Sequence, residues 1–365
     1  MPASSRAAHA HRPRRCSRTT GRLAAALLWL TGVAVGALAG QGHLPGERSL
    51  LDAHNAYPYE GRWADRLQRA LSTGLPVAIE QDLVYGIDAA TGVPLLVVAH
   101  DTDLEHPAPP LVEHFFEAVR PSIEEELAQP RPSDWPLITL NLDIKGPAGG
   151  GEEDLHLLRF LRDSVLGPHQ QWLTTSPRTA DGQPAPLRIG PLLVLTGASD
   201  AQQRVFRDEI EVGEPILAFG AARDAGADEQ DLPRPTPATD YRRWWNHPWR
   251  VVEPEGQRAA GEWTAADAER LRTLVVRAHE AGLWLRLYTL NGIGEEGSRQ
   301  RGWFAGYDFG SLDAVRERWR ACLVAGVDFV ATDQYEGLAA LRAASEHPAA
   351  RRERRTPPDP RSEQR

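Results

Sequence analysis

Short apolar runs that end in polar or charged residues recur along the chain, and segments with helical spacing separate them. Eight of these runs predict the main strands, at 49–55, 76–83, 137–145, 191–197, 215–219, 250–253, 283–291 and 327–333. A further run, 95–100, is expected to be an extra hairpin partner. Strands that alternate with helices are typical of a parallel sheet covered by helices. Eight of them favour a single closed (β/α)₈ TIM barrel over the alternative, an open doubly wound sheet.

Apolar residues at helical spacing predict the helices between these strands. They are expected at 63–73, 113–128, 155–165, 201–208, 264–281 and 312–325. Thr264 is the expected N-cap of the fifth helix, and Gly282 is expected to end it. We assign residues 40–345 to one barrel domain, because such a barrel commonly takes about 250 residues or more.

The two ends of the chain differ from the barrel in composition. Arginines precede an apolar run at 23–38, and Ala37-Leu38-Ala39 supplies small residues for cleavage, so residues 1–39 are predicted to be a secretory signal peptide. The protein would then be exported, to the periplasm or the extracellular space. The alternative is a retained N-terminal membrane anchor. Residues 346–365 are charged and poor in apolar side chains, which predicts a disordered tail.

Overall composition indicates a soluble globular protein, with 41% hydrophobic and 25% charged residues. Residues 1–39 hold six arginines and no acids, so their removal would change the formal charge from −9 to −15. So acidic a protein is not expected to bind nucleic acid. Cys16 would leave with the signal peptide and Cys322 would remain alone, so stability must come from the core. The sequence does not predict an oligomeric state.

The strand at 137–145 ends in the single lysine of the chain. The other 40 of the 41 basic Lys and Arg residues are arginines, which suggests that Lys145 is needed as a compact ammonium. The alternative is a chance surface lysine. Because strand side chains alternate between faces, Asn141, Asp143 and Lys145 are expected to point the same way.

Several chemically active residues fall at the ends of predicted strands, which share one rim of a barrel. The candidates are His54, Glu80, Asp82, His100, Asp143 and Lys145, with Asn55, Asn141, Tyr288 and Asn291 as candidate substrate-binding residues. A lone Glu-x-Asp is often a solvated strand edge, and a lone His-Asp pair is often a turn. The joint occurrence at separate strand ends favours a functional site.

These residue types suit phosphodiester chemistry with one divalent cation. The carboxylates of Glu80, Asp82 and Asp143 are the hard oxygen ligands that Mg²⁺ or Ca²⁺ prefers. Two histidines, His54 and His100, can serve as general base and general acid, because imidazole titrates near neutral pH. Lys145 would offset the charge of an anionic substrate.

The same residues carry a resemblance to a known family. The motifs are His54-Asn55, Glu80-Gln81-Asp82, His100-Asp101, Asp143-Ile144-Lys145, Tyr288-Thr289-Leu290-Asn291 and the run from Gly326 to Asp333. Over about residues 48–342 the chain resembles the phosphatidylinositol phospholipase C-like phosphodiesterases, which include glycerophosphodiester phosphodiesterases and the sphingomyelinase D type. It looks closest to the branch of the altered-inheritance-of-mitochondria protein 6. The resemblance implies the histidine, cation and lysine roles given above.

Three positions depart from the glycerophosphodiesterase pattern. Asn55-Ala56 stands where those enzymes have Arg-Gly, so a phosphate-binding arginine is missing there. Asp143 replaces their glutamate, as in the sphingomyelinase D type, and Tyr288 replaces a tryptophan. These departures keep the cation ligands and leave the class of diester open.

Two further features bear on partners. Tyr241, Trp244, Trp245 and Trp249 cluster with nearby arginines, either as a loop that contacts a lipid surface transiently or as part of the core. Arg286 shares a strand face with Tyr288, so it is expected to point into the barrel and to need an acidic partner.

The sequence therefore predicts an exported, metal-dependent phosphoric diester hydrolase, or a lyase that forms a cyclic phosphate. Its substrate would be a small glycerophosphodiester or a phospholipid headgroup. Two alternatives remain open. One is a non-catalytic barrel that binds a phosphorylated or sugar ligand, and the other is a glycoside hydrolase that uses two carboxylates on the same fold.

Overall fold

The computed structural model describes residues 44–59, 62–87, 91–92, 94–100, 108–145 and 152–346. The predicted signal peptide, Asp101 and the tail after residue 346 lie outside these ranges. Among the described residues, no helix combines the length and the apolar character that crossing a membrane would require.

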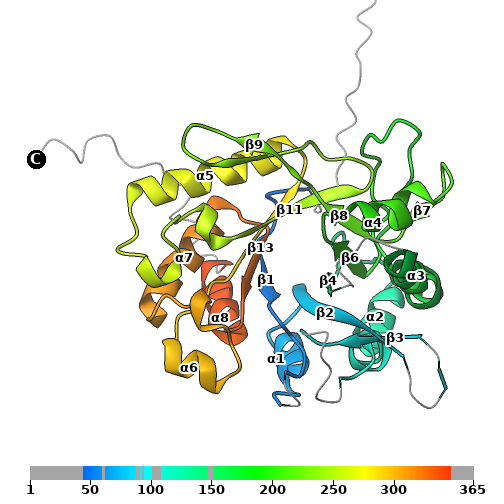
Figure 1. Ribbon diagram of the computed structural model, residues 1–365, viewed down its shortest axis with the longest axis horizontal. Helices are drawn as coiled ribbons and strands as arrows, with labels where there is room; N and C mark the ends of the chain where they lie inside the picture. Colours follow the sequence, from blue (N-terminus) through cyan, green and yellow to red (C-terminus); the bar gives the residue numbers. More distant parts are fainter. Residues whose placement is uncertain are drawn as a thin grey trace, which may run out of the picture. The chain divides into compact units, whose positions relative to one another are not determined.

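Eight parallel strands form a closed barrel (Figure 1). They are β1 (Leu50–Ala53), β2 (Val77–Ile87), β4 (Ile138–Lys145), β6 (Leu192–Thr196), β8 (Phe219–Ala221), β11 (Arg242–Pro248), β12 (Trp284–Tyr288) and β13 (Phe329–Thr332). Strand β1 pairs with both β2 and β13, which closes the ring. The predicted (β/α)₈ barrel is confirmed. Strand β3 (Pro94–Val98) runs antiparallel to β2, so the predicted extra hairpin partner is also confirmed.

Helices and helical turns connect the strands and surround the barrel (Figure 1). They include α1 (Arg66–Ser72), η1 (Val112–Phe116), α2 (Glu117–Leu127), α3 (Glu152–Phe160), η2 (Leu161–Leu166), η3 (Gly167–Trp172), α4 (Asp200–Gln203), η4 (Arg204–Asp208), α5 (Ala265–Glu280), α6 (Glu295–Gln300), η7 (Ala305–Tyr307), α7 (Leu312–Ala325) and α8 (Tyr335–Glu346). The predicted N-cap is confirmed, because Thr264 and Asp267 form a reciprocal capping box at the start of α5. Helices α6 and α8 were not predicted.

The sixth barrel strand is not where the sequence pattern placed it. The predicted strand at 250–253 is wrong, because Trp249–Val251 forms the 3₁₀ turn η5, and the barrel strand is β11 at Arg242–Pro248. Polar Arg242, Asn246 and His247 interrupt the apolar pattern of β11. The strand nevertheless pairs with β12 along five residues. Its polar side chains form hydrogen bonds with residues that are distant in the sequence and come close only in the folded chain.

Smaller elements refine the middle of the chain. The predicted strand at 215–219 is divided, because β7 (Pro215–Ile216) pairs with β5 (Ser176–Pro177) outside the barrel and β8 begins at Phe219. The polar stretch that follows contains the hairpin of β9 (Asp224–Ala227) and β10 (Pro233–Pro235).

The tryptophan-rich cluster belongs to the core. Tyr241, Trp244, Trp245 and Trp249 are each at most 1% exposed. The indole Nε1 of Trp244 donates to the Thr196 carbonyl at 2.9 Å, and that of Trp249 donates to Glu253 at 2.6 Å. A buried cluster cannot contact a lipid surface, so the interpretation as a lipid-binding loop is wrong and the interpretation as core is confirmed.

One glycine of the barrel wall supports this packing, and its replacement provides a first prediction. A Cβ at Gly220 would lie 2.3 Å from Cε1 of Tyr241, whose ring is fully buried. We expect Gly220→Ala to lower the free energy of unfolding by about 1–3 kcal/mol, as overpacking of a core does. Gly261→Ala is the matched control, since a Cβ there meets nothing within 4 Å. Urea denaturation tests this, and equal midpoints for the two variants would contradict it.

Candidate active site

A cavity of about 860 Å³ lies at the C-terminal ends of the barrel strands. Nine of the ten predicted site residues line it: His54, Asn55, Glu80, Asp82, His100, Asn141, Asp143, Lys145 and Tyr288. The structure thus brings together residues that the sequence separates by more than 200 positions.

The register of two neighbouring strands positions the acidic part of the site. Glu80 of β2 lies beside Asn141 of β4, and Asp82 lies beside Asp143 two residues further on. Because side chains alternate along a strand, all four face the barrel interior. Glu80, Asp82 and Asn141 are buried, whereas the side chain of Asp143 at the rim is 50% exposed.

Three carboxylates converge in the cavity. Glu80, Asp82 and Asp143 each offer one oxygen, and these oxygens lie within 4.8 Å of one another. Asp82 Oδ1 is buried and accepts no hydrogen bond from the described residues. Burial, followed by the charges of Glu80 and Asp143, raises the pKa of Asp82 to about 8. A set of crowded oxygen donors with an unsatisfied buried oxygen fits a hard divalent cation such as Mg²⁺ or Ca²⁺.

Lys145 lies against the same carboxylates. Its Nζ is 2.5 Å from Asp143 Oδ2 and 3.2 Å from Asp82 Oδ2. The lysine therefore contacts two of the three candidate cation ligands, as its strand position predicts.

Arg286 supplies a second cation, which unlike Lys145 is fully buried. Its Nε donates to Asp52, and its Nη2 lies 3.1 Å from Glu80 Oε1. The predicted inward orientation and acidic partner of Arg286 are confirmed. Asp52 is an additional site residue that the sequence did not indicate, since its partner lies 234 positions away.

His54 is held between two carboxylates. Its Nδ1 lies 3.2 Å from Asp333 Oδ2, and its Nε2 lies 3.5 Å from Glu80 Oε2. Burial disfavours the protonated ring, but the charges of Asp333 and Glu80 outweigh it and raise the pKa of His54 to about 9. At neutral pH the imidazole therefore carries a proton on each nitrogen.

The carboxylates in and around the cavity outnumber the cationic side chains that form ion pairs with them. Asp52, Glu80, Asp82, Asp143 and Asp333 form ion pairs with Arg286, Lys145 and His54. When all five carboxylates are ionised, the three cations leave two negative charges among these groups, even with His54 protonated. A bound divalent cation would neutralise them.

Asn291 does not line the cavity. It is buried, its Nδ2 donates to Asp333 Oδ2 at 2.6 Å, and its Oδ1 accepts from Thr332 Oγ1 at 2.9 Å. We therefore revise its predicted substrate contact to a role in orienting Asp333. Asp333 follows the last strand as the other acids follow theirs, so the same pattern could have identified it.

The remaining predicted residues lie at the edges of the cavity. His100 is exposed, with its ring centroid 6.0 Å from that of Tyr59. The backbone N–H of Asn55 donates to Glu80 Oε2 at 3.3 Å. The guanidinium of Arg286 lies 5.1 Å from the ring centroid of Tyr288, so the tyrosine packs against the buried ion network.

An aromatic wall that the sequence analysis did not identify completes the cavity. We use this name for Trp303, Phe304 and Tyr307, which line the cavity from the segment between α6 and α7. The segment has neither strand nor helix periodicity, so its pattern gave no reason to select these residues.

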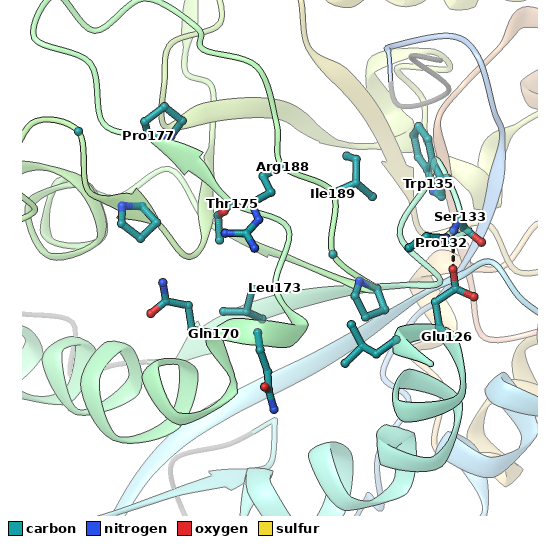
Figure 2. A pocket seen from close by; sticks show the side chains of 16 residues that line it. Glu126, Pro132, Ser133, Trp135, Gln170, Leu173, Thr175, Pro177, Arg188 and Ile189 are labelled. Carbon is teal, nitrogen blue, oxygen red and sulfur yellow. Dashed lines mark hydrogen bonds between the residues drawn. The ribbon is translucent and has the colours of Figure 1, made fainter. Parts of the chain in front are cut away.

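A second cavity, of about 710 Å³, lies near the N-terminal ends of the strands (Figure 2). Of the residues that line it, Pro191 directly precedes β6 and Trp135 lies three residues before the start of β4. None of the predicted site residues lines this cavity. Because barrel active sites lie at the opposite ends of the strands, we assign the site to the first cavity.

Comparisons with known proteins add little to this picture. No family model matches the chain, and no curated protein matches it. Among solved structures, it is similar to the crystal structure of a glycerophosphoryl diester phosphodiesterase from Parabacteroides distasonis. The two share 12% sequence identity with a TM-score of 0.38, over 82% of this chain and 87% of the other. With a likeness this low, the fold assignment rests on the strand order and pairing.

Proposed function

We propose that this protein is an exported, cation-dependent phosphodiesterase that hydrolyses a phosphoric diester or cleaves it to a cyclic phosphate. One observation carries the proposal: Glu80, Asp82 and Asp143 converge beside Lys145 and His54 in a single cavity. Export rests on the pattern of residues 1–39.

The cation would be held by the three converging carboxylates, and it would supply polarisation of a phosphate oxygen. Lys145 Nζ, within reach of the same place, would contact another oxygen of the anionic diester. Both interactions favour the transition state, in which negative charge grows on the phosphate oxygens.

His54 is the proposed general acid. Asp333 holds Nδ1, which leaves the proton on Nε2 at the Glu80 side, and the raised pKa keeps that proton in place at neutral pH. A proton delivered from Nε2 to the departing oxygen would avoid an alkoxide leaving group. His100, at the edge of the same cavity, is the proposed base for the attacking hydroxyl or water.

A glycoside hydrolase is the second candidate, because the raised pKa of Asp82 would suit a general acid. Both carboxylate oxygens of Asp82 are buried, however, and Lys145 Nζ lies 3.2 Å from Oδ2, so Asp82 is less accessible to a sugar oxygen than a general acid should be. The same burial suits a ligand of a small cation. The geometry therefore supports the diesterase better.

Turnover assays separate the candidates. The mature protein is offered bis(p-nitrophenyl) phosphate, glycerophosphodiesters and p-nitrophenyl glycosides, each with Mg²⁺, with Ca²⁺ and with EDTA. We expect turnover of a diester that EDTA abolishes. Glycoside turnover that persists in EDTA would replace the proposal with a glycosidase, and binding without any turnover would replace it with a ligand-binding barrel.

Lys145 should compete with the cation. Its ammonium contacts two of the three carboxylates, and hydrogen bonds to charged groups are worth about 1.5–3 kcal/mol. We expect Lys145→Met to bind Mg²⁺ or Ca²⁺ at least about tenfold more tightly and yet to turn over the diester more slowly. Calorimetric titration measures the affinity, with Arg48→Met, which removes an exposed ion pair with Asp134, as the control. Weaker cation binding by Lys145→Met would contradict this competition.

A further inference from the structure

The cavity has two chemically different walls. Strands β2 and β4 contribute a polar wall that contains Glu80, Asn141, Asp143 and Lys145. The aromatic wall of Trp303, Phe304 and Tyr307 contributes no charged group. Arg299, which also lines the cavity, is charged, and its guanidinium forms ion pairs with Glu295 and Glu296. The cavity is thus suited to a molecule with one charged and one apolar part.

Phe304 exposes an unusual amount of apolar surface at this cavity. The residue is 66% exposed, and among the exposed large hydrophobic residues in the described part of the chain it is the aromatic one. Single exposed apolar residues are common on protein surfaces. This one lines the cavity together with two other aromatic rings.

The aromatic wall leads from the solvent to His54. The ring centroids of Phe304 and Tyr307 are 4.7 Å apart in an edge-to-face arrangement. The ring of Tyr307 lies 6.0 Å from that of His54. An apolar group that extends along these rings would therefore place its attached phosphate near His54 and Lys145.

The segment that carries the wall is fixed in place. The Asp308 carboxylate accepts hydrogen bonds from Ser298 Oγ and from the backbone N–H groups of residues 293, 294 and 310. Gly302 packs so closely on Trp63 that a Cβ would lie 2.5 Å from the indole ring. Because the wall is already ordered, a ligand does not have to order it on binding.

We propose that the aromatic wall is a specificity subsite for an apolar chain, so that the preferred diester carries a single alkyl or acyl chain. The binding of an apolar chain is inferred from the cavity alone. The preference for such a diester as a substrate rests on the proposed diesterase function. The phosphate would lie at the polar wall and the chain along Tyr307 and Phe304. A diester without a chain would leave the phenyl ring of Phe304 exposed to water.

Calorimetry with alkylphosphocholines below their micellar concentrations tests the subsite. The full chain is titrated in EDTA with the hexyl, octyl and decyl compounds and with glycerophosphocholine, so that cation-dependent turnover does not intervene. Each buried methylene can strengthen binding by about fourfold. We expect at least a tenfold gain from hexyl to decyl, and glycerophosphocholine should bind most weakly.

Two variants connect the gain to the wall. Phe304→Ser should weaken decylphosphocholine binding at least fivefold, while Val324→Ser, which removes a side chain 72% exposed on α7, should leave it unchanged. Thermal denaturation of both variants checks that they fold. Affinity that does not depend on chain length, or equal affinities for the two variants, would overturn the proposal. So would a Phe304→Ser defect confined to phosphatidylcholine vesicles, which would indicate membrane contact.

Turnover of the same compounds with the preferred cation separates the two proposals. Diester turnover without any dependence on chain length would overturn the subsite and leave the diesterase. Chain-dependent binding without turnover of any diester would overturn the diesterase and leave the subsite.

Discussion

Replacement of His54 by alanine should lower kcat for a phosphodiester by about 10²- to 10⁴-fold, the range that positioned general acids and bases contribute. The buried ion pair with Asp333 and the 3.5 Å contact with Glu80 fix its ring at the cavity. Steady-state kinetics with bis(p-nitrophenyl) phosphate measure the loss. His156→Ala is the matched control, because His156 is exposed on α3 and does not line the cavity.

A milder variant tests the same arrangement. Asp333→Asn removes the charge that raises the pKa of His54, so the imidazole should lose its proton at lower pH. The limb of the pH–kcat profile that reports the general acid should therefore move to lower pH. His54→Ala activity within twofold of the unmodified protein, or an unmoved limb in Asp333→Asn, would remove His54 from the mechanism.

Loss of the Asp82 carboxylate should strongly weaken cation binding without unfolding the protein. Asp82 lies between Glu80 and Asp143, and loss of even an outer partner of a metal site weakens binding by about 10- to 100-fold. We expect Asp82→Asn to weaken Mg²⁺ or Ca²⁺ binding by more than this range and to lose cation-dependent turnover. Calorimetric titration and turnover assays measure the two effects.

The stability of the same variant provides the internal check. A carboxylate whose pKa is raised on folding destabilises the folded state once the pH exceeds its unfolded value near 3.8. In EDTA at neutral pH, Asp82→Asn should therefore be at least as stable as the unmodified protein. Asp313→Asn, with a side chain 97% exposed, is the control. Undiminished cation affinity in Asp82→Asn would contradict the assignment of the three carboxylates.

The acidic part of the site could be predicted from the sequence, because the geometry of a parallel barrel is enough to bring its residues together. In a parallel barrel the strand ends share one rim, so Glu80, Asp82, Asp143 and Lys145 could be grouped without knowledge of their contacts. His54 could be added because it follows the first strand. Their proposed roles depend on the same positions.

Other parts of the site depend on contacts that spacing does not encode. Arg286 pairs with Asp52 across 234 positions, and Asn291 holds Asp333 across 42. Asn291 has the residue type of a ligand-binding amide, but its Oδ1 already accepts hydrogen bonds from Thr332 Oγ1 and the backbone N–H of Asp333. These contacts form only in the closed barrel, so they cannot be predicted from residue spacing.

Segments without a regular apolar pattern also limit what the sequence can predict. The sequence pattern places the sixth barrel strand too late in the chain, because the polar residues of β11 interrupt its apolar pattern. In the structure β11 nevertheless pairs with β8 and β12. The tryptophans of that segment suggested a surface role on composition alone. The exposed aromatic residue at the cavity is instead Phe304, in a segment without periodicity.

Whether the protein is a cation-dependent diesterase can be measured by ³¹P NMR of a phosphodiester mixture incubated with the protein and Mg²⁺ or Ca²⁺. The mixture contains glycerophosphocholine, glycerophosphoglycerol and octanoyl lysophosphatidylcholine, with a parallel sample in EDTA. We expect at least one diester resonance to be replaced by a monoester or a cyclic phosphate resonance, and EDTA to prevent the change. Diester resonances that persist unchanged with both cations, from protein shown to be folded, would contradict it.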